Sequence, residues 1–189
     1  MKYFVLTTVL VSVVGVAAQR MTTNPADGHL KTLFPDAAYI SPHSGSPLHW
    51  KIYRDDPKKN PKAPPIALAW WSTDVMPLER GYAGPTHMFV GMNMSGIIVG
   101  AITDYSSDPY AFFSVEPPAF AAQFKDKSIR APFRVGEDIH AVSRATLTVQ
   151  SATRAVRDSA RTMAKLFLNP AVVRPAQDRP ARGREASHK

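Results

Sequence analysis

Two apolar segments joined by a short glycine-containing turn constrain this fold more than any other feature of the sequence. Residues 86–92 and 97–103 are rich in Val, Ile, Met and Phe, and residues 93–96 (Asn-Met-Ser-Gly) include a glycine that can take positive φ. This pattern predicts an antiparallel β-hairpin. Residues 48–54 alternate apolar with polar side chains and residues 66–73 are almost continuously apolar, so both predict further strands.

A long amphipathic helix follows later in the chain. Small and apolar residues recur at steps of three and four between positions 148 and 168, which predicts one buried helical stripe. Thr148 or Ser151 is the expected cap at its start. Asn169 and Pro170 predict its end.

Together these elements predict a single α+β domain over residues 33–168, with a small antiparallel sheet packed against the long C-terminal helix. A shorter helix is expected at residues 117–124, because proline is tolerated in a first helical turn. Four prolines between residues 55 and 65 predict an irregular loop between two of the strands.

The formal net charge of +8 lies largely outside this domain. Residues 170–189 carry five basic and two acidic residues, and Lys2 adds one positive charge, which leaves about +4 for the remainder. That remainder does not predict a nucleic-acid partner. Residues 170–189 are rich in Pro and Arg and show no periodicity, so they predict a disordered basic tail.

The first residues predict export. Lys2 precedes an apolar stretch shorter than a typical membrane span, and residues 16–18 (Val-Ala-Ala) supply the small side chains of a cleavage site. Residues 1–18 are therefore expected to be a signal peptide, and the protein to be periplasmic or otherwise extracytoplasmic. An uncleaved membrane anchor is the alternative. The absence of cysteine excludes disulfides, iron–sulfur ligation and cysteine nucleophiles.

A Ser/Thr-rich segment, residues 138–148, lies directly before the long helix. Hydroxyl groups and free backbone N–H groups at a helix N-terminus can bind an anion such as phosphate, and Arg144 adds a positive charge there. From spacing alone, however, an ordinary helix cap with a structural turn is the preferred interpretation.

The same segment resembles the flavinylation motif of a known family, the FMN-binding domain. That domain occurs in periplasmic subunits of Rnf- and Nqr-type redox pumps and in regulator-type flavoproteins of nitrous-oxide and nitrite reduction. The family motif reads Asp-x-x-Ser/Thr-Gly-Ala-Thr, and its positions are occupied here by His140, Ser143, Arg144, Ala145 and Thr146.

Other landmarks of the family occur in the expected order. Residues 81–85 (Gly-Tyr-Ala-Gly-Pro), the hairpin that follows them, and residues 120–128 are similar to family segments. The resemblance therefore extends from about Gly81 to Leu168, and residues 33–75 are loosely compatible with the leading strands of the family.

The resemblance implies that Thr146 receives FMN through a phosphodiester bond, installed by a separate flavin transferase that uses FAD and a divalent metal. It implies an exported flavoprotein that relays electrons between redox proteins such as a cytochrome, a quinol-linked membrane complex or a metalloenzyme. The expected cofactor-binding residues are Thr146, Ser143, Arg144, Ala145, Thr148, His140, Tyr82 and Gly84. The aromatic candidates for stacking on the flavin ring are Tyr82, Trp70, Trp71, Phe112 and Phe113, and for each of them alone ordinary core packing is the preferred interpretation.

Two positions differ from the family pattern. His140 stands where the family has an acid, although Asp138 lies two residues earlier, and Arg144 stands where it has glycine. These differences keep a second hypothesis open, in which the chain is a flavin-free binding or assembly module of the same fold for a periplasmic redox enzyme. An electron-transfer flavoprotein is favoured over a stand-alone enzyme.

No other chemistry is indicated by the sequence. The six histidines form no close His-x-His or His-x-x-x-His pair, so no metal site is predicted. Ser143 lacks the Gly-x-Ser-x-Gly context of serine hydrolases, and phosphate-loop and dinucleotide fingerprints are absent.

Overall fold

A five-stranded antiparallel sheet forms the centre of the computed structural model, which describes residues 25–173. The strands follow one another in sequence order across the sheet, each paired with the next. They are β1 (Tyr39–Ile40), β2 (Trp50–Tyr53), β3 (Ala67–Trp71), β4 (Thr86–Asn93) and β5 (Ile98–Ser106). The predicted α+β class and the four predicted strands are confirmed. The expected signal peptide at residues 1–18 lies outside the described residues.

The β4–β5 hairpin has the predicted turn. Asn93 Oδ1 accepts hydrogen bonds from the backbone N–H groups of Ser95 (2.9 Å) and Ile97 (3.0 Å). Gly96 takes a φ of +75°, which an L-residue rarely adopts. The turn sets the antiparallel pairing of β4 with β5, which are the two longest strands of the sheet.

One face of the sheet packs against the helix α5 (Thr146–Phe167). Side chains of β3 and β4 alternate between the two faces, because successive residues of a strand point in opposite directions. Trp70, Met88 and Val90 point towards α5, whose buried stripe includes Val149 and Val156. The predicted long helix is confirmed, although it starts at Thr146, two residues before the predicted first position.

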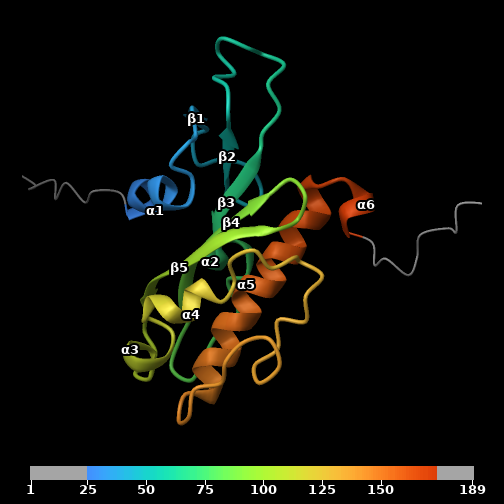
Figure 1. The fold of residues 1–189 in the computed structure, drawn as a ribbon. Helices are drawn as coiled ribbons and strands as arrows, with labels where there is room; N and C mark the ends of the chain where they lie inside the picture. Colours follow the sequence, from blue (N-terminus) through green and yellow to red (C-terminus); the bar gives the residue numbers. More distant parts are fainter. Residues whose placement is uncertain (1–24, 174–189) are drawn as a thin grey trace, which may run out of the picture.

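The opposite face is covered by a helix that was not predicted, α1 (Pro25–Leu33) (Figure 1). Ala26, Leu30 and Phe34 are spaced four residues apart and bury their side chains against Trp71 and Phe89. The packed domain therefore includes residues before the predicted boundary at residue 33. The sheet is enclosed on both sides, and only its α5 face was expected.

Four short helices complete the described chain, and these are α2 (Ser72–Val75), α3 (Ala111–Ser114), α4 (Pro118–Ala122) and α6 (Pro170–Val173). The helix α4 confirms the prediction at residues 117–124. The helix α6 corrects the prediction of a disordered tail from residue 170. Arg130 donates hydrogen bonds to the carbonyl oxygens of Ala171 and Val172, and Val172 packs on the core. Residues 174–189 lie outside the described part.

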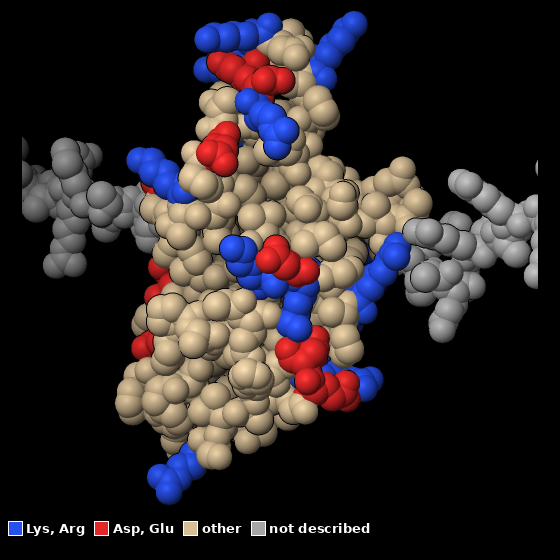
Figure 2. Space-filling view, viewed as in Figure 1, with Lys and Arg blue, Asp and Glu red and all other residues tan. Residues whose placement is uncertain are grey.

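The start of α5 and the helix α3 lie at the same end of the molecule, at the bottom of Figure 1. The proline-rich loop between β2 and β3 projects from the other end. In the same view, Figure 2 shows charged side chains gathered on that projecting loop and few over the region of α3 and α4. Within residues 25–173, no helix combines the length and hydropathy that a membrane span requires.

Candidate functional site

The first turn of α5 presents Thr146 to solvent. Thr146 is the first residue of the helix, its side chain is exposed, and the residue before it, Ala145, has no capping side chain. The first helical hydrogen bond runs from the Val149 N–H to the Ala145 carbonyl oxygen (2.9 Å). The N–H groups of the preceding residues therefore point out of the helix end without a helical acceptor, as at any helix N-terminus.

The predicted caps, Thr148 and Ser151, lie inside the helix instead. The helix α5 begins two residues earlier than predicted, so Thr148 and Ser151 are helical residues and not caps. Both side chains lie on the buried face of the helix. Within the described residues, Thr148 Oγ1 and Ser151 Oγ are buried and have no hydrogen-bond partner. A buried hydroxyl group without a hydrogen-bond partner lowers the stability of the fold, so the two groups are unusual features of the helix start.

Arg144 turns the chain into α5 with a left-handed backbone. Its φ is +69°, and its side chain is exposed, as is that of Ser143. The next residue closes the turn, since the Ala145 N–H donates to the Val142 carbonyl oxygen (3.2 Å). Glycine adopts this conformation without the steric cost that a Cβ imposes. The position at which the family motif has glycine is therefore one that requires positive φ, and arginine occupies it under strain.

A glycine-containing loop lies against the first turn of α5. The Gly81 N–H donates to the Gly84 carbonyl oxygen (2.8 Å) and closes the loop. A Cβ added at Gly81 would lie 2.8 Å from Asp108 Oδ2 and 3.5 Å from Thr148 Cα. A Cβ added at Gly84 would overlap the Ser107 side chain. Glycine at these two positions lets the loop approach the Asp108 carboxylate and the Ser107 side chain.

The buried carboxylate of Asp108 fixes that loop in place, and the sequence analysis did not identify it. Its Oδ2 accepts from the N–H groups of Tyr82 (2.7 Å) and Ala83 (3.4 Å), and its Oδ1 accepts from the Tyr110 N–H (3.0 Å). The side chain is 4% exposed. The signal available in the sequence was Ser-Asp-Pro at residues 107–109, which is typical of a turn and does not by itself indicate a site.

These segments enclose a pocket of about 270 Å³ at the start of α5, which is lined by Tyr82, Tyr110, Arg144, Ala145, Thr146, Leu147 and Thr148. Five of the eight predicted site residues lie in this lining. Ser143, Gly84 and His140 do not, although Gly84 shapes the adjacent loop. The structure thus brings most of the predicted residues together and adds Tyr110 and Leu147 to them.

Asp138, the acidic residue two positions before His140, forms hydrogen bonds within its own loop. Asp138 accepts hydrogen bonds from the backbone N–H groups of Arg134 (2.7 Å) and Phe133 (3.1 Å), and from Lys127 Nζ (3.4 Å). Burial raises the pKa of the Asp138 carboxyl, but these three donors together bring the pKa below its ordinary value. His140 is exposed, and its N–H donates to Gln123 Oε1 (2.7 Å). Neither residue lines the pocket.

The predicted stacking aromatics separate into two groups. Trp70 is buried in the core, and Trp71 stacks on His87 on the α1 face (4.3 Å between ring centroids), so neither tryptophan reaches the pocket. Tyr82 lines the pocket and contacts Tyr110 edge to face, with 5.4 Å between the ring centroids. Phe113 contacts Tyr110, and Phe112 contacts Phe113 further from the pocket.

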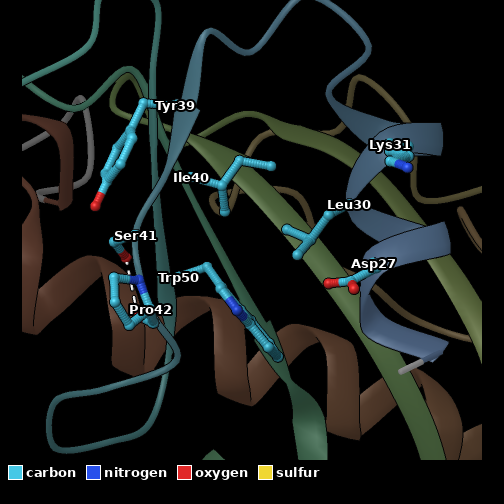
Figure 3. A pocket seen from close by; sticks show the side chains of 8 residues that line it. All are labelled: Asp27, Leu30, Lys31, Tyr39, Ile40, Ser41, Pro42 and Trp50. Carbon is cyan, nitrogen blue, oxygen red and sulfur yellow. Dashed lines mark hydrogen bonds between the residues drawn. The ribbon is translucent and has the colours of Figure 1, made fainter. Parts of the chain in front are cut away.

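A larger pocket, of about 410 Å³, lies between α1 and the strands β1 and β2 (Figure 3). Leu30 and Ile40 approach it from opposite sides, and Trp50 lies beneath them. It contains no residue of the predicted site and no concentration of polar groups that would act on a ligand. Among residues 25–173, no group of three or more His, Asp or Glu side chains could hold a metal ion.

The pocket at the start of α5 has the features that a phosphate-bearing cofactor requires. It combines the free N–H groups of the helix start, the Arg144 cation and the exposed Thr146 side chain. Residues 81–161 match the family model described as the FMN-binding domain. This match confirms the predicted resemblance and indicates FMN as the cofactor. No curated protein matches the chain.

Proposed function

Taking FMN as the cofactor of the domain at residues 81–161, we propose that this chain is an exported flavoprotein that carries FMN covalently on Thr146 and relays electrons between redox proteins. The observation that carries this proposal is the placement of Thr146. Its side chain is exposed at the first position of a long helix, on the lining of the pocket.

The helix start supplies the phosphate-binding groups. The N–H groups of its first turn and the Arg144 guanidinium favour an anion next to the Thr146 hydroxyl. Ala145 is small and buried, so it leaves the approach to the helix end open. Thr148 also lines the pocket, but its hydroxyl group is buried and has no partner within the described residues.

The proposed attachment balances in atoms. The Thr146 oxygen forms a new P–O bond to the FMN phosphate of FAD, the pyrophosphate bond of FAD breaks, AMP leaves and the hydroxyl proton is released. The chain gains the mass of FMN less one water. A separate flavin transferase performs this reaction, and the exposure of Thr146 at the helix end leaves room for that enzyme.

Electron relay is the function that such a site serves. Bound flavin accepts and returns electrons one or two at a time, while the protein positions it and tunes its potential. The residues of this chain hold the phosphate, and they leave the pocket open to solvent on the side of Tyr82 and Leu147, which are both exposed. A cytochrome, a quinol-linked membrane complex or a metalloenzyme is the proposed class of partner.

Export forms the second part of the proposal. It rests on the pattern of residues 1–18, in which a basic start is followed by an apolar stretch and a small-residue cleavage site. Fractionation of cells that express the full chain tests this part, because a periplasmic or extracytoplasmic protein shortened by about 18 residues is expected. Recovery of uncleaved chain in the cytoplasm would contradict it.

A flavin-free binding or assembly module is the second candidate function. The observation that favours it is the strained left-handed backbone of Arg144, at the position where the family motif has glycine. Under this alternative, the pocket and its exposed tyrosines would contact a redox enzyme directly. The two candidates differ in a single property, which is whether Thr146 carries FMN.

Intact-mass measurement separates them. The full chain is co-expressed with an active flavin transferase, beside Thr146→Ala and the matched control Thr162→Ala, a threonine of the same helix outside the pocket. We expect a gain of FMN less water, stable to denaturation, in the wild type and in Thr162→Ala, and none in Thr146→Ala. An unmodified wild type, with the transferase active on another substrate, would exclude covalent flavin and leave the binding module.

A further inference from the structure

The carboxylate of Asp108 is buried without a cationic partner. It is 4% exposed, and none of the ion pairs within residues 25–173 includes it. A buried carboxylate is costly unless hydrogen-bond donors replace its lost hydration. Three backbone N–H groups do so here, and hydrogen bonds from N–H groups to a carboxylate are among the strong ones in proteins.

That carboxylate connects two segments that are distant in sequence. One oxygen holds the backbone at Tyr82 and Ala83, and the other holds the backbone at Tyr110, immediately before α3. Its own N–H donates to Ser106 Oγ (3.2 Å), at the end of β5. Asp108 therefore ties the glycine-containing loop, α3 and the sheet to one another through main-chain groups.

Two of the three residues whose N–H groups donate to Asp108 are tyrosines that line the pocket. Tyr82 is 62% exposed and Tyr110 is 36% exposed, and their rings meet edge to face. Both line the pocket that contains Thr146. Two large aromatic rings held side by side and uncovered form a surface suited to another planar aromatic group, because such contacts stabilise beyond the area they bury.

We propose that Asp108 is a positioning residue of the flavin site, which sets Tyr82 against Tyr110 as one aromatic wall for the isoalloxazine ring. This inference rests on the proposed function and extends it from the phosphate end of the cofactor to the ring. Tyr110 and Asp108 are new assignments, and Trp70 and Trp71 are excluded from the wall by their burial in the two cores.

Substitution of Asp108 by asparagine breaks the arrangement with little change in shape. An amide has only one acceptor oxygen, so its NH2 group must face at least one of the N–H groups that the carboxylate now accepts. We expect the loop at Tyr82 or the start of α3 at Tyr110 to move, and the aromatic wall to open. Thr146 takes no part in these hydrogen bonds, so FMN attachment is expected to persist.

The test measures flavin emission and its anisotropy in the full chain, co-expressed with the flavin transferase. The variants are Asp108→Asn, Tyr82→Leu and Tyr110→Leu, with Phe112→Leu as the matched control, because Phe112 is 70% exposed and does not line the pocket. Tyrosine in contact with flavin quenches its emission. Loss of one aromatic contact is expected to lower the stacked-to-free ratio about fivefold.

Higher emission and lower anisotropy in the first three variants, with Phe112→Leu like wild type, support the proposal. Unchanged emission in both tyrosine variants overturns the aromatic wall. An unchanged Asp108→Asn beside altered tyrosine variants overturns the positioning role. If Asp108→Asn does not fold, Ser106→Ala takes its place, since Ser106 Oγ accepts the Asp108 N–H.

Failure of the covalent proposal is distinguished by mass. If the wild type carries no FMN, free FMN is titrated into the same variants in a Thr146→Ala background, and quenching of its emission is followed. The affinity for FMN is then expected to fall about fivefold in each tyrosine variant and to stay unchanged in Phe112→Leu. Equal affinities in all of them would overturn the proposal.

Discussion

The two faces of the central sheet satisfy their polar groups in different ways. On the α1 face, His29 Nε2 and His87 Nδ1 lie 3.0 and 3.5 Å from the carboxylate oxygens of Asp104. His87 also stacks on Trp71. On the α5 face, at the start of the helix, the Thr148 and Ser151 hydroxyls are buried and have no partner within the described residues.

This difference separates a structural surface from a functional one. A polar group that is paired and stacked stabilises the fold where it lies, whereas a buried group without a partner does not. The backbone strain at Arg144 occurs at the same end of α5 as the unpaired hydroxyls. The α1 face thus stabilises the sheet, and the proposed cofactor site lies at the strained start of α5.

Removal of the fully buried aromatic ring at the centre of the α1 face should have the greatest effect on stability. Phe89 is fully buried and contacts Trp50 and Trp71, so Phe89→Ala is expected to lower the free energy of unfolding by about 3–5 kcal/mol. Urea unfolding measures this loss. FMN attachment should persist under folding conditions, and a loss below about 1 kcal/mol would contradict the assigned core.

A smaller loss of stability is expected from substitution of Asp138, in the loop that precedes α5. Asp138→Asn removes the charged acceptor of two backbone N–H groups and is expected to cost about 1–2 kcal/mol at pH 7. Glu137→Gln is the matched control, since its pair with Arg134 is exposed, and it should change stability little.

The effect of Asp138 should depend on pH in one direction. Because the folded-state pKa of Asp138 is lowered, its stabilisation is fully present above the unfolded pKa of about 3.9 and is lost as the pH falls through the folded pKa. The difference in unfolding free energy between wild type and Asp138→Asn should therefore shrink below about pH 4. A difference that grows on acidification would refute the assignment.

Arg144 tests the strain at the flavin end. Arg144→Gly relieves the left-handed backbone and is expected to raise stability by about 0.5–1 kcal/mol, after the entropy cost of glycine. Arg144→Ala keeps the Cβ and the strain, so it should bring no gain. Thermal unfolding of the two variants separates backbone strain from charge. Equal stability of the glycine and alanine variants would show that positive φ costs nothing here.

The smallest effect is expected from the paired histidines of the α1 face. Asp104→Asn weakens two partly exposed pairs and should cost less than about 1 kcal/mol, because solvent screens such pairs. It should leave FMN attachment and flavin emission unchanged. A change in flavin emission on this substitution would show that the two faces of the sheet are coupled.

The sequence was sufficient to predict the hairpin, the inner strands and the long helix, because each has a clear apolar period. It did not reveal α1, since the helix is short and only three apolar side chains at four-residue spacing, Ala26, Leu30 and Phe34, mark its buried face. The position of such a helix depends on contacts with strands distant in sequence, and the local sequence pattern does not contain this information.

The candidate site was predictable where a motif names residues directly. Thr146, Arg144, Ala145, Thr148 and Tyr82 line one pocket as expected. Asp108 and Tyr110 were missed, because their role arises from hydrogen bonds to a loop more than 20 residues earlier in the chain. Trp70 and Trp71 lie in the two cores, which is the interpretation preferred for each aromatic residue alone, because adjacent strand residues face opposite sides and both sides are core.

The central claim is that one threonine carries the flavin, and tandem mass spectrometry of a single peptide tests it most directly. Trypsin cleaves after Arg144 and Arg154 and releases residues 145–154, which include Thr146, Thr148, Ser151 and Thr153. We predict that fragment ions place the mass of FMN less water on Thr146. The same mass on Thr148, Ser151 or Thr153, or an unmodified peptide from protein exposed to an active transferase, would contradict the account.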